Sequence, residues 1–539
     1  MKPNWLSADA WRRAVVPGLA LVAAAAACDS TPGTAPDAGD VFEDRSAGDD
    51  AGAPAAPRVV WARAFGGTAH EEGIDLAADR AGNVSVAAVV HGGPVVLGDG
   101  VTVADSVCLL RLDDSGRLDW GVVPTSVGTT DYDYVNLRNR VDVDGSGNTY
   151  WAFALGDAGG APPEVDVGCG NVTLRPPGTA RANSYTVVAA YSSAGACLWS
   201  RGLSSGTSEL SQLSDVVPYD IAASSGRLFL PLRADGATLF HDGAPVLETG
   251  EPFGNLLLAL NASDGSVAWA KSVTHGSSIR QGPLVVDDLP DGGILFAGRH
   301  DGDLEPEPLG CGTPSDGFFM ARLDADGNCV WSAGSLQGSA GPIGVVAEAD
   351  GGAYAIAAMG GDIDLGCGMV VDREAPNPGF LLVRRDASGN CALSRFIGTT
   401  GLIGAGALPV GSLAGTAAGD LFFAGRIGNF WEPDGVPVSY TATGLYSSEG
   451  VQLARLDPNG HYRWHLALEL SHDILVGARE DVEMAAAIGL DGAVYVTGWF
   501  QSQLLRYGET SDGQLVHSAF DSACDMDCNR DMFVVKVAP

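Results

Sequence analysis

Residues 316–331, DGFFMARLDADGNCVW, decide the fold of this chain of 539 residues. The apolar run 318–323 predicts a strand, the polar segment 324–328 predicts a tight turn, and the tryptophan that follows belongs to a second strand. Related strand–turn–strand segments recur along the chain. The sequence therefore predicts a repeat protein.

Two markers in the sequence give the same number of repeats. Tryptophans of the second strand recur at intervals of 59 to 79 residues, with Leu393 standing at the position of one of them. They are Trp61, Trp120, Trp199, Trp269, Trp331 and Trp464. A Gly-containing turn before an apolar strand, such as Gly82-Asn83-Val84, also recurs once per interval. Both markers indicate seven units.

Each unit contains four predicted strands, which we name A to D. In the first unit they span about residues 73–78, 84–90, 107–112 and 118–123. Antiparallel four-stranded units that are repeated radially are the blades of a propeller, which leaves only short sheet edges. The sequence thus predicts an all-β fold, a seven-bladed β-propeller.

The order of the predicted strands shows how the ring would close. The first strand, at residues 59–65, carries a tryptophan and is of the D type, whereas the last strand, at residues 532–537, is of the C type. The N-terminal strand can therefore complete the last blade. We expect these two segments to pair within one sheet.

The connections differ in length in a regular way. The A–B and C–D turns are short, whereas B–C connections are long, as at residues 157–183, 299–315 and 501–531. In an antiparallel blade the B–C and D–A connections emerge on the same face, and loops on a rigid scaffold commonly carry binding sites. Aromatic residues assigned to these loops are candidate ligand contacts, although loops also pack on their own aromatics. The candidates are Tyr132, Tyr134, Phe430, Trp431, Trp499 and Phe500.

The N-terminus has the composition of a targeting segment. Lys2, Arg12 and Arg13 precede an apolar run, residues 14–27, that is too short to span a bilayer. The run ends at Cys28 and resembles a bacterial lipoprotein signal, in which this cysteine is lipidated; simple secretion is the alternative. We expect a signal peptide at 1–27, an acidic Pro/Gly-rich disordered tether at 28–57, and the propeller at 58–539.

The formal net charge of −35 limits the classes of partner. Nucleic-acid binding requires a basic surface, so this composition argues against it. Anionic lipid surfaces are equally poor partners, which leaves the N-terminal lipid as the expected membrane contact. Cations and basic ligands remain compatible with the charge.

The unit resembles the bacterial β-propeller repeat of the SBBP type. In that repeat a Gly-Asn turn leads into a Val/Tyr-rich strand, and a D-x-F-v-x-K/R-L-D-x-x-G-N-x-x-W segment follows. Residues 316–331 match this segment, and residues 531–537, DMFVVKV, match its beginning. The resemblance implies the fold but no specific activity. Residues 259–269 also resemble the tryptophan-docking motif of quinoprotein-like propellers, which we interpret as a shared structural solution without a shared cofactor.

The cysteines form a repeated pattern. In three units a Gly-Cys-Gly in the B–C connection precedes a Cys at the start of strand D. For an exported protein this pattern predicts the disulfides Cys169–Cys197, Cys311–Cys329 and Cys367–Cys391. Cys524 and Cys528 are expected to form a local bridge in the last B–C loop. Cys108 lies mid-strand and is interpreted as a buried apolar residue.

Other residue patterns have a structural reading beside the functional one. Asp142 to Asn148 resembles the start of a Ca²⁺ loop, but Phe153 stands where the closing Glu would be, so a plain hairpin is favoured. The repeated tryptophans suggest inter-blade core more than sugar stacking. His70-Glu71-Glu72 falls in a predicted D–A connection, where nothing in the sequence fixes a catalytic geometry. We therefore expect no catalytic residues, no metal site and no cofactor.

These observations favour a monomeric, lipid-anchored protein of the cell envelope, periplasmic or on the cell surface. It would bind a protein or glycan ligand through the face that carries the long B–C and D–A loops. One alternative is a secreted propeller enzyme, a lyase or glycosidase acting on polysaccharide. The other is an assembly factor of the envelope. Histidine and carboxylate side chains converging at the centre of the ring would favour the enzyme.

Overall fold

The computed structural model describes residues 57–538 with gaps in the connections. The gaps are 67–69, 93, 99–100, 105, 128–138, 157–163, 175–183, 207–214, 225, 249–253, 274–283, 301–316, 372–378, 400–410, 417–418, 426–428, 432–436, 439–450, 471–484, 490–491, 501–503, 508–512 and 517–530. The predicted signal peptide, the lipidation site Cys28 and almost all of the tether lie outside the described residues. Pro54–Pro539 form one compact unit.

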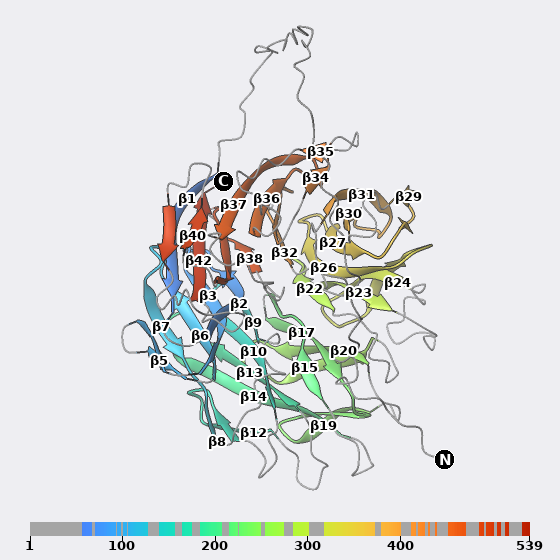
Figure 1. Cartoon of the computed structure of the whole chain (residues 1–539). Helices are drawn as coiled ribbons and strands as arrows, with labels where there is room; N and C mark the ends of the chain where they lie inside the picture. Colours follow the sequence, from blue (N-terminus) through green and yellow to red (C-terminus); the bar gives the residue numbers. More distant parts are fainter. Residues whose placement is uncertain are drawn as a thin grey trace, which may run out of the picture. The chain divides into compact units, whose positions relative to one another are not determined.

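The unit is an all-β, seven-bladed propeller, as the repeat predicts (Figure 1). From the inside outward, blade 1 contains β2 (His70–Ala78), β3 (Val84–His91), β6 (Ser106–Leu112) and β7 (Leu118–Val122), and blade 2 contains β9 (Asn139–Val143), β10 (Thr149–Gly156), β13 (Ser184–Tyr191) and β14 (Cys197–Gly206). Blade 3 contains β15 (Val216–Pro218) with β16 (Ala222–Ser224), β17 (Arg227–Ala234), β20 (Asn255–Asn261) and β21 (Val267–Ser272).

Blade 4 contains β22 (Val285–Asp288), β23 (Ile294–His300), β24 (Gly317–Leu323) and β25 (Cys329–Gly334), and blade 5 contains β26 (Ala340–Ala347), β27 (Ala353–Met359), β30 (Gly379–Arg385) and β31 (Cys391–Thr399). Blade 6 contains β32 (Gly411–Gly415), β33 (Leu421–Gly425), β36 (Val451–Leu456) and β37 (Tyr462–Leu470); blade 7 contains β38 (Ala485–Ile488), β39 (Val494–Phe500), β42 (Asp531–Ala538) and β1 (Arg58–Phe65). The deciding stretch forms the hairpin β24–β25.

The ring is closed by strands from opposite ends of the unit. Strand β1 pairs antiparallel with β42, in a register that places Val59 opposite Val537 and Phe65 opposite Met532 (Figure 1). The predicted pairing of the N-terminal and C-terminal strands is therefore confirmed. The innermost strands also contact one another from blade to blade around the whole circle, in the order β2, β9, β16, β22, β26, β32, β38 and back to β2.

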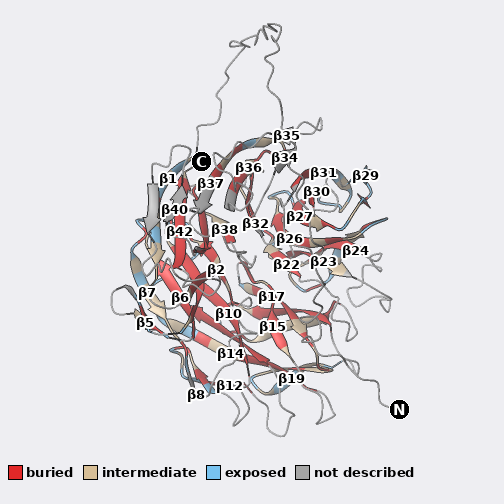
Figure 2. Cartoon of the chain, viewed as in Figure 1, coloured by how far each residue is buried: buried red, intermediate tan, exposed pale blue. Residues whose placement is uncertain are grey.

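Burial follows the position of a strand in its blade (Figure 2). All residues of β6 and β13, which are C strands, are buried, whereas all five residues of the outer strand β7 are at least partly exposed. A middle strand faces a neighbouring blade on each side, so its side chains are removed from water on both faces. Each aliphatic side chain buried in this way contributes about 1.5–3 kcal/mol to folding.

The repeated tryptophans join most of the blades to the next one. The indole N–H groups of Trp61 and Trp199 donate to backbone carbonyls of Asp114 and Ala262, in the C–D turn of the following blade, at 2.8 Å. The turn glycine makes room for the ring: a Cβ on Gly116, where φ is +77°, would lie 2.8 Å from Trp61. The tryptophans are therefore inter-blade core, as predicted.

Trp464 shows what happens at the seam. The next blade is blade 7, whose strands C and D are β42 and β1 and share no C–D turn. The indole nitrogen of Trp464 has no hydrogen-bond partner among the described residues, and neither has that of Trp331, although the blade after Trp331 does have a C–D turn. The Trp464 ring packs edge-on against Phe422 at a centroid distance of 5.7 Å. The pairing of β1 with β42 thus closes the sheet of blade 7, but it provides no C–D turn for Trp464 to contact.

The B–C connections of six blades are folded as hairpins, whereas the sequence predicts loops at these positions. Their strands are β4 (Val95–Gly98) with β5 (Val101–Val103), β11 (Glu164–Asp166) with β12 (Asn171–Thr173), β18 (Thr238–His241) with β19 (Ala244–Glu248), β28 (Ile363–Asp364) with β29 (Met369–Val370), β34 (Asn429–Trp431) with β35 (Pro437–Val438), and β40 (Leu504–Tyr507) with β41 (Gly513–Val516). In blade 4 the corresponding residues lie outside the described part of the chain.

Five of the insertion hairpins are bonded to an outer strand of the preceding blade or to the segment that follows it, and the sixth shares a core cluster with that blade. Strands β18, β34 and β40 pair with the outer strands β14, β31 and β37 of blades 2, 5 and 6. Strand β11 pairs with β8 (Thr125–Val127), which follows the outer strand of blade 1, and Asp364 bridges to Gln337 after blade 4. The hairpin β4–β5 places Val95 in one core cluster with Val534 of blade 7. The insertions therefore reinforce the ring as well as carrying exposed surface.

Two predicted disulfides are present in the described residues. Cys169–Cys197 and Cys367–Cys391 each join an insertion hairpin to the first residue of a D strand, with a Cα–Cα distance of 5.5 Å. Cys329 is also disulfide-bonded, but its predicted partner Cys311 lies outside the described residues, as do Cys524 and Cys528. Cys108 is free and buried, as expected for an apolar core position.

Candidate functional site

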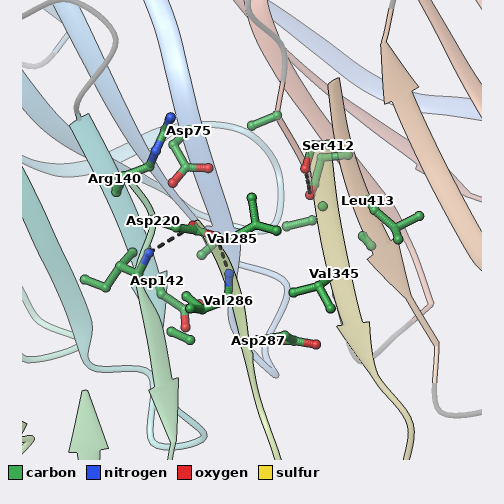
Figure 3. Close-up of a pocket in the computed structure, with 18 of the residues that line it drawn as sticks. Asp75, Arg140, Asp142, Asp220, Val285, Val286, Asp287, Val345, Ser412 and Leu413 are labelled. Atoms are coloured by element: carbon green, nitrogen blue, oxygen red, sulfur yellow. Dashed lines mark hydrogen bonds between the residues drawn. The ribbon is translucent and has the colours of Figure 1, made fainter. Parts of the chain in front are cut away.

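A channel lies at the centre of the ring. Its lining comes from the innermost strand of every blade, and its volume is about 360 Å³ (Figure 3). Carboxylates are concentrated on the side of blades 1 to 4, at Asp75, Asp142, Asp220 and Asp287, whereas blades 5 to 7 contribute apolar and small side chains. The lining is therefore polar on one side only.

The four aspartates hold neighbouring innermost strands together. Oδ2 of each residue accepts the backbone N–H of the next blade, from Val141 to Asp75 (3.0 Å), from Ala223 to Asp142 (2.6 Å), from Val286 to Asp220 (2.9 Å) and from Ala347 to Asp287 (2.7 Å). Oδ1 of each accepts the N–H of the following residue in its own strand, at 2.8 to 3.1 Å. Between blades 6 and 7 the Ser412 hydroxyl donates to the Ala486 carbonyl.

Burial dominates the electrostatics of these carboxyl groups. It raises the pKa of Asp220 to about 7, helped by the negative charge of Asp75, while Arg140 and the backbone N–H donors act in the opposite direction. Burial and the neighbouring Asp288 raise the pKa of Asp287 to about 8. The pKa values of Asp75 and Asp142 are also raised, chiefly by burial.

Arg140 is the one basic residue among the described residues of the channel lining. Its Nε donates to the backbone carbonyl of Tyr219 at 2.7 Å, which joins blades 2 and 3. Figure 3 shows Arg140 beside Asp75. Its positive charge lowers the pKa of Asp75 and of Asp220 against the effect of burial. One cation therefore faces several buried acids.

The arrangement limits what the channel can do chemically. Both oxygens of each bridging carboxylate already accept backbone hydrogen bonds, so these groups act first as inter-blade acceptors. Within the described residues, no group of three or more His, Cys, Asp and Glu side chains is placed to hold a metal ion. A carboxyl group with a pKa near neutrality can nevertheless donate a proton, which is the chemistry required of a general acid.

The predicted ligand-contact residues are not gathered at one place in the described structure. Tyr132 and Tyr134 lie outside the described residues. Phe430 and Trp431 belong to the insertion strand β34, which pairs with the outer strand of blade 5. Whether any of them contacts a ligand stays a prediction.

Trp499 and Phe500 were assigned to a loop, and that placement is wrong. Both belong to strand β39, and Trp499 is 5% exposed. They end the strand and pair with Met532 and Asp531 of β42, so they precede the connection that the sequence predicts at 501–531. Large apolar residues extend a B strand here rather than opening a loop.

His70, Glu71 and Glu72 were also misplaced by the sequence pattern. They form the first residues of β2, and the carboxylate-bearing side chains of Glu71 and Glu72 are 1% and 5% exposed. Polar residues at a strand start were read as a connection, since their composition is that of a loop. They belong to the core of blade 1 on the insertion side.

The turn from Asp142 to Asn148 is a hairpin turn, as favoured above. Asp144 Oδ1 accepts the backbone N–H groups of Ser146 and Asn148, and its Oδ2 accepts the Asn148 amide and the Tyr150 hydroxyl. Asp142 instead lines the channel and bonds to Ala223. The two carboxylates therefore serve different neighbours, and the turn does not bring them together.

Comparisons with known proteins add little beyond the fold. No protein-family model matches the sequence, and no curated protein matches it. The structure is similar to BamB from Moraxella catarrhalis (12% identity, TM-score 0.30, covering 89% of this chain and 99% of that one). It is also similar to the quinohemoprotein alcohol dehydrogenase ADHIIG from Pseudomonas putida HK5 (12%, 0.36, 87% and 76%) and to a europium-containing methanol dehydrogenase (11%, 0.33, 89% and 93%).

Likenesses with such low identity and TM-score carry no argument about activity, ligand or partner. The resemblance to the SBBP-type repeat accordingly rests on the sequence alone. In the part of the chain that the structure describes, no helical segment has the length and hydropathy needed to cross a bilayer.

Proposed function

We propose that the chain is an extracytoplasmic, lipid-anchored propeller that binds a protein or glycan ligand through the side carrying the insertion hairpins. The observation that carries this proposal is the folding of six B–C insertions into hairpins, five of which are bonded to an outer strand of the preceding blade or to the segment that follows it. Surface elements held in one conformation lose less entropy on binding than free loops do, so they suit recognition. The closed ring supplies the rigid support.

The proposed location rests on the disulfides and on the N-terminal sequence. Disulfides such as Cys169–Cys197 form and persist in oxidising compartments, which favours an extracytoplasmic protein. The lipoprotein-like sequence ending at Cys28, followed by the acidic segment 29–57, supports a lipid anchor with a flexible tether. Both features are consistent with the cell envelope.

The described residues include seven large exposed apolar side chains: Val60, Val96, Leu198, Val330, Leu336, Met369 and Val371. Val60, Leu198 and Val330 lie separately near the starts of outer strands, at the C–D turn side. Met369, Val371 and Leu336 instead come together, because Leu336 is hydrogen-bonded to the hairpin that carries the other two. A grouped apolar surface favours an interaction site, whereas single exposed apolar residues are common.

Oriented immobilisation tests the proposal. The full chain would be attached through a thiol introduced by Ser115→Cys, on the exposed C–D turn side, or by Thr102→Cys, on the exposed face of an insertion hairpin. Glycans from an array and solubilised envelope proteins would be passed over both surfaces. We expect binding when the insertion side is free and at least tenfold less when it is attached. Equal binding to both surfaces would contradict the proposed side. If neither the glycans nor the envelope proteins contained a specific ligand, the proposed function itself would be contradicted.

One observation favours the enzyme as a second candidate. The raised pKa values of Asp220 (about 7) and Asp287 (about 8), in a central cavity, are typical of carboxyl groups that act as general acids. The candidate would be a glycosidase or lyase acting on polysaccharide.

Turnover on a panel of polysaccharides tests this candidate. Activity that is lost in Asp220→Asn or Asp287→Asn, and kept in the exposed-turn variant Asp326→Asn, would establish the enzyme and overturn the non-catalytic proposal. An envelope assembly factor is a special case of protein binding. The same oriented capture would reveal it through an envelope-protein partner.

A further inference from the structure

Two insertion hairpins of this chain have the same architecture but different outward faces. Residues 164–173 of blade 2, EVDVGCGNVT, align without gaps with residues 362–371 of blade 5, DIDLGCGMVV. The disulfide cysteine, both flanking glycines and the preceding aspartate occupy identical positions. The main differences of polarity are at two positions, where Asn171 and Thr173 of blade 2 correspond to Met369 and Val371 of blade 5.

The shared positions build the same rigid hairpin twice. Asp166 Oδ1 accepts the backbone N–H groups of Gly168 and Gly170 at 2.8 and 3.0 Å, and Asp364 Oδ1 accepts those of Gly366 and Gly368 at 2.8 and 3.3 Å. All four glycines have positive φ, between +86° and +107°. Both hairpins thus share one backbone conformation.

Each hairpin is also fixed from beneath by its own blade. The Tyr191 hydroxyl donates to the Val167 carbonyl at 2.7 Å, and the Arg385 guanidinium donates to the Leu365 carbonyl at 2.8 Å. These two side chains end corresponding C strands. Together with the disulfides, they hold the hairpins in one orientation on the ring.

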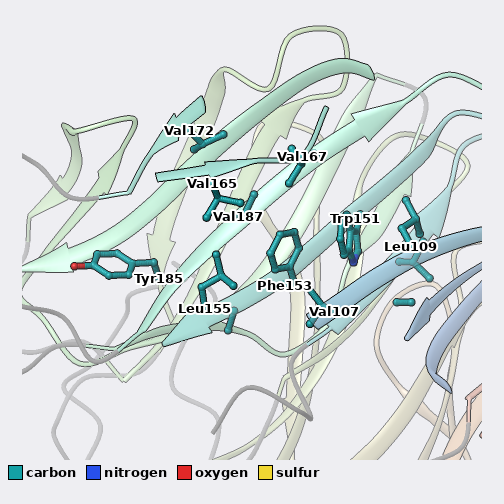
Figure 4. Close-up of a cluster of buried hydrophobic side chains, with 14 of the residues drawn as sticks. Val107, Leu109, Trp151, Phe153, Leu155, Val165, Val167, Val172, Tyr185 and Val187 are labelled. Carbon is teal, nitrogen blue, oxygen red and sulfur yellow. The ribbon is translucent and has the colours of Figure 1, made fainter. Parts of the chain in front are cut away.

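Inward-facing residues of the two hairpins are conserved in character because they join the core. Figure 4 shows Val165 and Val172 of blade 2 beside Val187 of β13, and all three are buried. Ile363 and Val370 are the counterparts of Val165 and Val172 in blade 5 and are buried as well. The fold therefore requires apolar side chains on the inner face only.

The outward face has no such requirement. In blade 2, Asn171 is exposed and its amide donates to the Glu164 carboxylate at 3.1 Å, which is an ordinary solvated surface. In blade 5, Met369 and Val371 are 46% and 54% exposed. Leu336, joined to this hairpin by its N–H bond to the Asp364 carbonyl (2.7 Å), is 72% exposed. The same scaffold thus carries an apolar surface where the fold accepts a polar one.

The charges beside this surface indicate the chemistry of its partner. Asp364 lies directly opposite Met369 in the hairpin register, and exposed Asp362 precedes it by two residues. The whole chain has a formal net charge of −35. An anionic lipid surface would be repelled, whereas a segment with apolar side chains flanked by Lys or Arg would find complementary groups.

We propose that the outward face of the hairpin β28–β29, formed by Met369 and Val371 with Leu336 beside them, docks a partner protein segment in which apolar side chains are flanked by basic ones. This inference rests on the proposed binding function and names one site and one partner chemistry for it. Met369 and Val371 supply the contact area, and Asp362 and Asp364 select the basic flank.

The matched test uses the blade 2 sequence as the substitute. Met369→Asn with Val371→Thr gives the blade 5 hairpin the residues of blade 2, changes no charge, and keeps every group that fixes the hairpin. The probe is a fluorescent capped heptapeptide of alternating lysine and leucine, with a lysine–serine peptide as its control. Anisotropy titration of the full chain is expected to show at least about tenfold weaker binding of the lysine–leucine peptide by the double variant. The lysine–serine peptide should not distinguish the two proteins.

The reverse exchange completes the experiment. Asn171→Met with Thr173→Val is expected to create a second site and to double the number of lysine–leucine peptides bound. Equal affinity of wild type and the Met369→Asn, Val371→Thr variant would overturn the inference. So would binding of phosphatidylglycerol vesicles that is lost in this variant, because the surface would then serve a lipid.

A photoreactive residue placed at position 369, with position 171 as the control, extends the test to the producing cell. A cross-link specific to position 369 must reach a basic–apolar segment of another protein; a cross-link to a second copy or to residues 1–53 of this chain would overturn the assignment. Failure of this site while oriented capture still finds a ligand would leave the proposed function standing.

Discussion

The Asp220 carboxyl group should make a contribution to the stability of the ring that falls as the pH rises. Asp220 has an ordinary pKa of 3.8 and a pKa of about 7 in the folded protein. Between these values the folded chain holds a proton that the unfolded chain has lost, so this contribution is fully present below about pH 4 and is lost as the pH rises through 7. The difference of about three pH units corresponds to at most about 4 kcal/mol. Asp220 is partly exposed to the channel, and solvent screening reduces this to about 2 kcal/mol.

Asp220→Asn removes this titration, but the amide has one acceptor oxygen where the carboxylate has two, so it loses the hydrogen bond from Ile221 or from Val286 at every pH. The pH dependence is therefore measured as the difference in unfolding temperature between the variant and the wild type, by differential scanning calorimetry at about pH 4 and pH 8. Between these pH values the difference should shift by about 2 °C in favour of the variant, since about 2 kcal/mol is spread over the melting entropy of a unit of this size. Asp326→Asn, at an exposed C–D turn, is the control and should show no such shift. A difference that stays constant, or that shifts in favour of the wild type, would refute the reasoning, since Asp220 would then contribute mainly as an ionised acceptor.

Four further predictions follow from other parts of the ring. Gly327→Ala should cost about 2 kcal/mol or more, because φ is +78° and the new Cβ would lie 2.8 Å from the Trp269 ring; Gly492→Ala, with φ of +77° and open space around it, should cost only about 1 kcal/mol in the same denaturation assay. Cys169→Ser with Cys197→Ser should lower unfolding free energy by about 3 kcal/mol, as expected for a loop closed over 28 residues, and reduction should then have no further effect on that blade. Removing residues 58–65 should abolish cooperative unfolding of the ring, since β42 would lose its partner strand. An unchanged calorimetric transition would contradict the closure of the ring by β1 and β42. Cys28→Ala should move the protein from the detergent phase to the aqueous phase on Triton X-114 partition, and an unchanged distribution would exclude Cys28 as the anchor.

The fold was predictable because its markers repeat at corresponding positions. Tryptophan in strand D and glycine in the C–D turn are two halves of one contact, as Trp61 and Gly116 show, so each occurrence predicts the other in the next blade. Because the first strand is of the D type and the last strand is of the C type, the sequence also predicts that these two strands pair and close the ring. These features depend on local sequence patterns, which can be recognised in a single sequence.

The insertion hairpins were missed although the sequence carried a signal for them. Gly-Cys-Gly between alternating apolar residues, as in residues 164–173, is a turn flanked by two short strands. The cysteines indicate disulfide partners, and the alternation of apolar residues beside them indicates the two strands. The pairing of an insertion with the preceding blade, such as β18 with β14, depends on tertiary placement and had no local signal.

The channel carboxylates had no recognisable spacing. Asp75, Asp142, Asp220 and Asp287 precede the glycine of their A–B turns, at positions 82, 147, 226 and 292, by seven, five, six and five residues. The offset varies from blade to blade: Asp75 lies two residues farther from its turn glycine than Asp142 and Asp287 do, and Asp220 lies in the interruption between β15 and β16. In a chain with 66 acidic residues, four at irregular offsets do not stand out. Only the geometry shows that each reaches the next blade.

The contacts that close the ring are separate from the outward residues of the insertions, and this explains where binding specificity can change. On the turn side, tryptophan and glycine join most neighbouring blades, and at the centre the carboxylates join the first five, so closure does not depend on the outward residues of the insertions. The insertions need only their inner apolar residues, their glycines and their disulfides to keep their form. Outward positions such as 171 and 369 can therefore differ without cost to the fold, and a difference there changes what the surface contacts.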